Sequence, residues 1–157
     1  MKIIIFSDSH RLLGGMADAV EFEKPDQIIH LGDLERDADY LRKKYPRIPL
    51  CGVPGNCDYS SRDTFTKLIK LEGKSFFINH GHTYHVKYGY DAIINAACLS
   101  GADFLLFGHT HVPYYAEEHG LVIINPGSIR DCGSYGVLEL SKGSHKYELM
   151  NTDDILL

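Results

Sequence analysis

The sequence predicts an α/β fold, with a largely parallel sheet from its first half and short strands in a mixed or antiparallel sheet near its end. In residues 1–58, short apolar runs rich in Ile alternate with segments of helical spacing, which is the pattern of βαβ units. From residue 121 onward, short apolar runs are separated by turns rich in Pro, Gly and Ser. The 157 residues contain no internal repeat, low-complexity segment or linker. We therefore expect one domain over residues 1–157.

Three strands and two helices are expected in the first half. The β-branched, apolar run at residues 2–6 suits a strand buried on both faces. The first helix is indicated by the spacing of Met16, Ala19 and Val20, and the second helix stops before Pro46. The expected strands span residues 2–6, 27–31 and 48–53, and the expected helices span residues 16–23 and 36–45.

The second half is expected to contain one helix among further strands. Ile93, Ala96 and Ala97 share one helical face, and Gly101 is a typical stop. The expected helix spans residues 88–100, and strands are expected at residues 74–79, 103–107, 121–124, 135–140 and 145–150.

Composition narrows the function classes. No apolar run approaches the roughly 20 residues that span a bilayer, and the first apolar run meets Ser7 and Asp8 too soon for a signal peptide. We therefore expect a cytoplasmic protein without membrane contact, whose four cysteines, none in a Cys-x-x-Cys pair, remain thiols. The net charge is −5, and the one basic block is residues 42–44, which argues against a broad nucleic-acid-binding surface.

Polar side chains with metal-binding chemistry follow five of the expected strands. Carboxyl ends of strands in open α/β sheets form a ligand-binding edge, so we expect these side chains to converge. Each has an ordinary alternative: Asp8 and Asp33 as helix caps, Asn56 as a turn residue, His80 as a loop histidine. Their recurrence at five strand ends favours one shared site. The seven candidates are Asp8, His10, Asp33, Asn56, His80, His109 and His111.

The mixture of donors indicates the kind of metal. Four imidazoles, two carboxylates and one amide oxygen suit divalent ions such as Mn, Fe, Ni or Zn. Seven donors are too many for one tetrahedral zinc, but they are enough for two ions about 4 Å apart if one carboxylate bridges them. Two divalent ions and two aspartates leave roughly +2 when the histidines are neutral. Such a site favours a phosphate-containing substrate.

The spacing of these residues resembles the five signature blocks of the calcineurin-like metallophosphoesterases. The matching blocks are Asp8-x-His10, Gly32-Asp33, Gly55-Asn56-Cys57-Asp58, His80-Gly81 and Gly108-His109-x-His111. The small size and the run Asn125-Pro126-Gly127-Ser128 are similar to the compact bacterial and archaeal phosphodiesterase branch. The resemblance implies a four-layer α/β/β/α sandwich of two mixed sheets, with a dinuclear metal centre at the strand ends.

The resemblance also implies a division of the ligands and a reaction. Asp8, His10, Asp33 and His111 would hold one ion, and the second would be held by Asn56, His80 and His109, with Asp33 as the bridge. A hydroxide between the ions would attack phosphorus in line. Mn is the first choice, with Ni, Fe or Zn as alternatives. The implied activity is that of a metal-dependent phosphodiesterase, with a small phosphate ester as substrate.

Three further positions have candidate roles. Cys57 stands where many family members carry a histidine that helps to protonate the leaving group, so we expect diesters, or esters with good leaving groups, to be preferred over alkyl monoesters. His82 is a candidate proton donor, with an inert histidine as the alternative. Arg130 follows a Pro-Gly turn and is a candidate phosphate contact, with a simple tight turn as the alternative. With Asp33 and Asn56, His82 and Arg130 complete the expected catalytic set.

Two other functions are weighed against the phosphodiesterase. A non-catalytic protein-binding scaffold occurs in this fold as the eukaryotic retromer subunit, whose metal site is degenerate; here all seven ligand positions are filled. A phosphomonoesterase or nucleotidase of the same fold is disfavoured by Cys57 and by the short chain. Besides the substrate, we expect further copies of this chain as partners, in a homodimer or a larger homo-oligomer.

Overall fold

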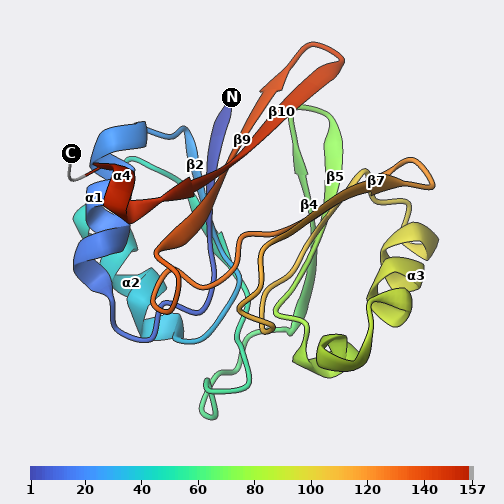
Figure 1. The fold of residues 1–157 in the computed structure, drawn as a ribbon, viewed down its shortest axis with the longest axis horizontal. Helices are drawn as coiled ribbons and strands as arrows, with labels where there is room; N and C mark the ends of the chain where they lie inside the picture. The colour runs from blue at the N-terminus through green and yellow to red at the C-terminus, as the bar shows by residue number, and fades with distance from the viewer. Residues whose placement is uncertain (156–157) are drawn as a thin grey trace.

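Two five-stranded mixed sheets face each other in the computed structural model, which describes residues 1–155. The first sheet has the strand order β10-β9-β1-β2-β3 and the second the order β4-β5-β6-β8-β7. Helices α1, α2 and α4 cover the first sheet, and α3 covers the second (Figure 1). The predicted four-layer α/β/β/α sandwich is thereby confirmed.

The strands of the first sheet come from both ends of the chain. β1, β2 and β3 run parallel, and β9 pairs antiparallel with both β1 and β10. The strands of this sheet are β1 (Lys2–Phe6), β2 (Gln27–His30), β3 (Leu50–Gly52), β9 (Ser134–Ser141) and β10 (Ser144–Asn151). Its helices are α1 (Leu13–Glu23), α2 (Glu35–Lys44) and α4 (Thr152–Ile155).

The second sheet is built from the middle of the chain. β5, β6 and β8 run parallel, with antiparallel β4 and β7 at the two edges. Its strands are β4 (Thr66–Leu71), β5 (Lys74–Asn79), β6 (Phe104–Leu106), β7 (Tyr114–Glu118) and β8 (Leu121–Asn125). Two short 3-10 helices, η1 (His82–Tyr84) and η2 (Val86–Tyr88), precede α3 (Asp91–Leu99).

Several predicted boundaries were wrong, and two edge strands were not predicted. The helix expected at residues 88–100 begins only at Asp91, because Gly89 has a φ of 148° and breaks the helical path between η2 and α3. The helix expected from residue 16 begins at Leu13, although Gly14 and Gly15 lie in its first turn. β4 and β7 escaped prediction because their sequences carry charged residues and are only partly buried, as edge strands often are.

Apolar side chains fill three layers of packing. The central layer, between the sheets, includes Ile5, Ile29, Phe76 and Leu106, all buried. The outer layers pack α1 and α2 on the first sheet and α3 on the second. Within residues 1–155, none of the helices has the length and apolar character that a membrane crossing requires. The expectations of a single domain and a cytoplasmic location stay predictions.

Candidate metal centre

One edge of the sandwich collects the seven candidate ligands. They follow the carboxyl ends of five strands, β1, β2 and β3 in one sheet and β5 and β6 in the other. Because the two sheets are stacked, these five ends face one another across the same edge. The loops after them therefore meet in one volume although they are far apart in the sequence.

Asp8, His10 and His111 form the first half of this cluster. One donor atom from each lies within 4.8 Å of the other two. Nε2 of His111 lies 3.1 Å from Oδ1 of Asp8, and the His10 and His111 rings are 5.8 Å apart. Asp8 is fully buried, whereas the two histidines are partly exposed.

Asn56, His80 and His109 form the second half. Nε2 of His80 lies 3.1 Å from Oδ1 of Asn56 and 3.2 Å from Nδ1 of His109. Burial, together with the neighbouring His80, lowers the pKa of His109 to about 4. This ring is therefore neutral at pH 7 and has a nitrogen lone pair available for an ion.

The Asp33 carboxylate lies between the two halves. Its Oδ2 is 3.9 Å from Nε2 of His10 and 3.5 Å from Nε2 of His80. Burial acts to raise the pKa of Asp33, but His80 and hydrogen bonds from Cys57 outweigh it, so the pKa lies below its ordinary value. Asp8 reaches in the same direction, with Oδ1 3.7 Å from Nε2 of His80. Both aspartates thus contact both halves.

The chemistry of these donors fits a cation. The Leu31 carbonyl, 2.7 Å from Nδ1 of His80, can only accept, so Nδ1 donates to it and Nε2 faces the amide oxygen of Asn56 at 3.1 Å. In this tautomer a neutral ring presents the Nε2 lone pair, beside the Asn56 oxygen, to an ion. Among residues 1–155, only histidines form ion pairs with the buried Asp8 and Asp33. Buried carboxylates without Lys or Arg partners call for a metal ion.

The backbone at the site is held in an unusual conformation. Asp8, His10, Asp33, His109 and His111 all have positive φ, between 40° and 69°, a region that non-glycine residues seldom adopt and that clusters at functional sites. Gly108 makes this packing sterically feasible. A Cβ at Gly108 would lie 1.9 Å from Oγ of Ser7 and 2.9 Å from Oδ2 of Asp8.

A second glycine, Gly55, leaves room for the Asp33 carboxylate. A Cβ at Gly55 would lie 2.0 Å from Oδ1 of Asp33, so any side chain there would displace the carboxylate. The same Oδ1 accepts a hydrogen bond from the Cys57 amide over 2.9 Å. The Gly55-Asn56-Cys57 turn therefore shapes the pocket for Asp33 as well as supplying Asn56.

Three supporting carboxylates surround the ligands. Oδ2 of Asp131 lies 2.5 Å from Nδ1 of His111 and so orients Nε2 toward Asp8. Asp58 accepts from the amides of Gly55 and Glu35, both at 2.7 Å, and ties the loop after β3 to the start of α2. Asp37 accepts from Oγ of Ser9, which also contacts Nε2 of His30. Asp131 was not among the predicted site residues, because it is 20 residues from His111 and lies outside the signature blocks.

The remaining candidates lie at different distances from the ligands. Cys57 adjoins them, with Sγ within 4.8 Å of donor atoms of His10 and Asp33; burial and its hydrogen bond to Asp33 raise its pKa to about 11, so it is a neutral thiol. The His82 ring lies 5.5 Å from that of His80, and burial and His80 lower its pKa. Arg130 is exposed beside Asp131 and lines a hollow that contains none of the seven ligands.

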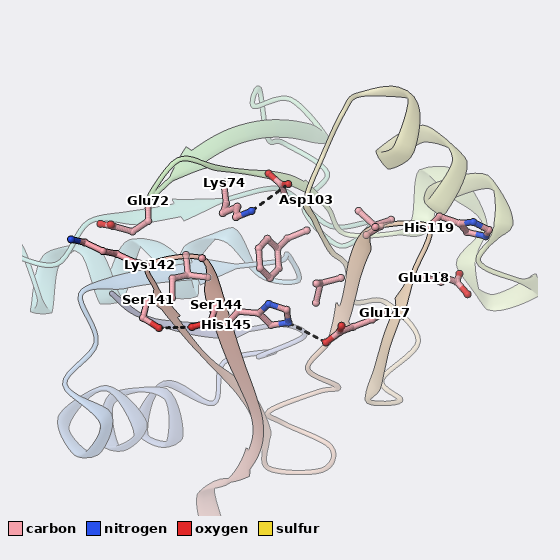
Figure 2. Close-up of a pocket in the computed structure, with 16 residues that line it drawn as sticks. Glu72, Lys74, Asp103, Glu117, Glu118, His119, Ser141, Lys142, Ser144 and His145 are labelled. Carbon is pink, nitrogen blue, oxygen red and sulfur yellow. Dashed lines mark hydrogen bonds and ion pairs between the residues drawn. The ribbon is translucent and has the colours of Figure 1, made fainter.

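A further hollow lies away from this edge. A cavity of about 470 Å³ opens at the other end of the sandwich, between the β4–β5, β7–β8 and β9–β10 turns (Figure 2). Its charged rim includes the Lys74–Asp103 and His145–Glu117 pairs, over a floor that contains Phe104. Lys74 begins β5, and Asp103 and Phe104 lie at the start of β6, whereas His80 and His109 follow the ends of these strands. The large cavity is therefore separate from the metal ligands.

Comparison with known proteins gives the family. The model of the calcineurin-like phosphoesterase superfamily domain matches residues 1–143. The chain belongs to the calcineurin-like phosphoesterase superfamily. This chain is 34% identical to the probable metallophosphoesterase YsnB of Bacillus subtilis, over 83% of the chain and 76% of the relative. It is 26% identical to a phosphodiesterase of Methanocaldococcus jannaschii, over 93% and 97%.

Solved structures agree with the fold of this chain. A conserved protein of Streptococcus pneumoniae, described as a predicted phosphoesterase, superposes with a TM-score of 0.80 at 25% identity, over 97% of this chain and 90% of that one. Vps29 of Entamoeba histolytica, solved in complex with zinc, has a TM-score of 0.76 at 20% identity, over 97% and 99%. The second likeness concerns the fold alone.

Proposed function

We propose that this chain is a dinuclear-metal phosphodiesterase acting on a small phosphate ester. Asp8, His10 and His111 would hold one ion, Asn56, His80 and His109 the other, and Asp33 would bridge them. Manganese is the first choice, with Ni, Fe or Zn as alternatives. Two such ions, when bound, would supply Lewis-acid charge for the phosphoryl oxygens and activate water as the nucleophile.

The position of Asp33 carries the proposal. Its Oδ2 lies 3.9 Å from a nitrogen of one half of the cluster and 3.5 Å from a nitrogen of the other, so one carboxylate faces both sets of donors. A single ion would leave donors on one side without a partner. The complete set of seven donors, together with relatives named as phosphodiesterases, supports hydrolysis over the scaffold alternative.

The chain's own residues define what the site does with a substrate. Asp131 fixes the ring of His111, and the Leu31 carbonyl fixes that of His80, so both rings keep one orientation while the phosphate binds. Cys57, next to the cluster, is a neutral thiol and a weak proton donor. This supports a preference for esters whose leaving group needs no protonation.

The proton-donor and phosphate-contact roles have unequal support. His82 lies near His80 and His109, yet its lowered pKa leaves little of the protonated ring at neutral pH. Arg130 is exposed, and among residues 1–155 it forms no ion pair. His82 stays a candidate for contact with the substrate rather than a strong acid, and the Arg130 role stays a prediction. The homo-oligomeric state also stays a prediction.

A metal panel tests the proposal. Protein stripped of metal is reconstituted with Mn, Ni, Zn, Fe or Mg, and hydrolysis of bis-p-nitrophenyl phosphate is compared with that of p-nitrophenyl phosphate. We expect activity that depends on a transition metal and a higher kcat/KM for the diester. Asp33→Asn should reduce turnover at least about 100-fold, because the weaker ligand faces both ions.

Two results would count against the proposal. Tight binding of metal without hydrolysis of either ester under any condition would favour the scaffold. Turnover by Asp33→Asn at the level of the unmodified chain would contradict the bridging role. Glu118→Gln, at the end of β7 and outside the seven ligands, is the matched control and should behave like the unmodified chain.

A further inference from the structure

A smaller hollow, of about 340 Å³, adjoins the candidate metal centre on the side of α2. Cys57 forms part of its wall, and Sγ of Cys57 lies within 4.8 Å of donor atoms of His10 and Asp33. The rest of the wall comes from Arg11, from the start of α2 and from residues 58–61. The loop around residue 60 projects from the sandwich near α2 (Figure 1). The volume lies in the range of small-molecule sites, so a substrate with its scissile phosphate at the seven candidate ligands can extend into it.

Two guanidinium groups line this hollow without acidic partners. Arg11 directly follows the candidate ligand His10, and Arg36 lies in the first turn of α2. Both side chains are exposed, and neither forms an ion pair within residues 1–155. Arginine is the side chain best suited to phosphate, because its planar fork donates two parallel hydrogen bonds.

The acidic residues in the same wall are mostly engaged elsewhere. Asp37 is buried and accepts from Oγ of Ser9 and from the Arg11 amide, both at 2.7 Å. Asp58 accepts from three backbone amides, and Asp39 pairs with Arg42 at 2.6 Å. Glu35 is the remaining carboxylate. Arg11 and Arg36 therefore line the hollow without an ion-pair partner from its wall within residues 1–155.

We propose that Arg11 and Arg36 bind a second phosphate group of the substrate, next to the phosphate that is hydrolysed. This inference rests on the proposed function, because it takes the scissile phosphate to lie at the seven ligands. The substrate class is then a phosphodiester that carries an additional phosphate monoester. Tyr59, 93% exposed on the rim, offers a ring on which a nucleobase can stack, so nucleotides are the suitable probes.

Binding without turnover is the first test. Calorimetry on the Mn-loaded protein compares thymidine 3′,5′-bisphosphate with thymidine 5′-monophosphate. We expect the bisphosphate to bind at least about tenfold more tightly, because a bidentate, charge-assisted contact is added. Arg36→Gln and Arg11→Gln should each remove most of that difference, and the double variant all of it. Arg47→Gln, an exposed arginine outside the hollow, should retain it.

Kinetics gives a second, matched readout. The p-nitrophenyl ester of thymidine 5′-monophosphate and its 3′-phosphorylated counterpart have the same scissile bond and leaving group. The 3′-phosphorylated ester should have the higher kcat/KM, mainly through a lower KM, and Arg36→Gln should affect this ester alone. Circular dichroism shows that the variant is folded.

The two proposals fail in different ways. Equal affinity for the two nucleotides in the unmodified protein, or a preference that survives in the Arg11→Gln/Arg36→Gln double variant, would overturn the second-phosphate site even if diesters are hydrolysed. A preference that depends on Arg11 and Arg36 in a protein without hydrolytic activity would uphold the phosphate site and overturn the phosphodiesterase.

Discussion

The contact between Asp131 and His111 leads to a quantitative prediction about metal affinity. Nδ1 of His111 donates to Oδ2 of Asp131 over 2.5 Å, so Nε2 keeps its lone pair for an ion. A hydrogen bond to a charged group contributes about 1.5–3 kcal/mol. The two side chains are 33% and 49% exposed, and solvent screening reduces the expected contribution to about 1 kcal/mol.

Asp131→Ala should therefore weaken one of the two metal sites and spare the other. A loss of about 1 kcal/mol corresponds to roughly fivefold in affinity. Titration calorimetry of Mn into the metal-stripped protein measures both binding events, and the event that involves His111 should be weakened. Glu118→Gln removes a distant carboxylate and is the control for net charge.

Either of two results would refute the orienting role of Asp131. Unchanged affinity in both binding events would mean that Asp131 does not orient His111. An equal loss in both events would point to a general electrostatic effect of the missing charge, which Glu118→Gln should then reproduce. Asp131→Asn refines the test, because it keeps an acceptor for His111 and should lose less affinity than the alanine variant.

Two further predictions concern stability and are checked by urea unfolding of metal-free protein. Gly108→Ala should lower the free energy of unfolding by about 1–3 kcal/mol, because its Cβ would overlap Oγ of Ser7. The control is Gly14→Ala, in open space within α1, which should leave the free energy of unfolding unchanged or raise it. Equal effects of the two substitutions would contradict the steric argument. Burial lowers the pKa of His30 from 6.5 to about 4 in the folded protein. Between these two pH values the unfolded state binds more protons than the folded state. The free energy of unfolding should therefore fall as the pH falls, by up to about 3 kcal/mol. His30→Gln should flatten this slope, and an unaltered slope would exclude His30 as its source.

Much of the fold and the position of the candidate site could be predicted because both depend on local pattern. A buried strand is recognisable as a short apolar run, and its end as an abrupt change to polar residues, as at Phe6-Ser7-Asp8 and Phe107-Gly108-His109. The carboxyl ends of parallel strands meet at one edge whatever the loops do. The convergence of the seven side chains therefore followed from the strand assignments.

Other features depend on contacts that no local pattern reveals. The start of α1 at Leu13 depends on packing against the sheet, which outweighs the low helix propensity of Gly14 and Gly15. β4 is held by a full antiparallel ladder with β5, although Lys67 and Lys70 interrupt its apolar pattern. Asp131 meets His111 only because the turn after β8 folds over the loop after β6.

The backbone of the site gives an argument that is independent of the donor chemistry. A loop that only reverses the chain adopts positive φ most cheaply with glycine, and Gly73 and Gly143, in the β4–β5 and β9–β10 turns, are examples in this molecule. Five of the seven candidate ligands instead adopt positive φ with a side chain present, at a cost on the order of 1 kcal/mol each. The flanking strands must compensate for this strain. The strained residues are the same aspartates and histidines that face one another in the site. This coincidence indicates that the loops are shaped to direct these side chains and do more than connect strands.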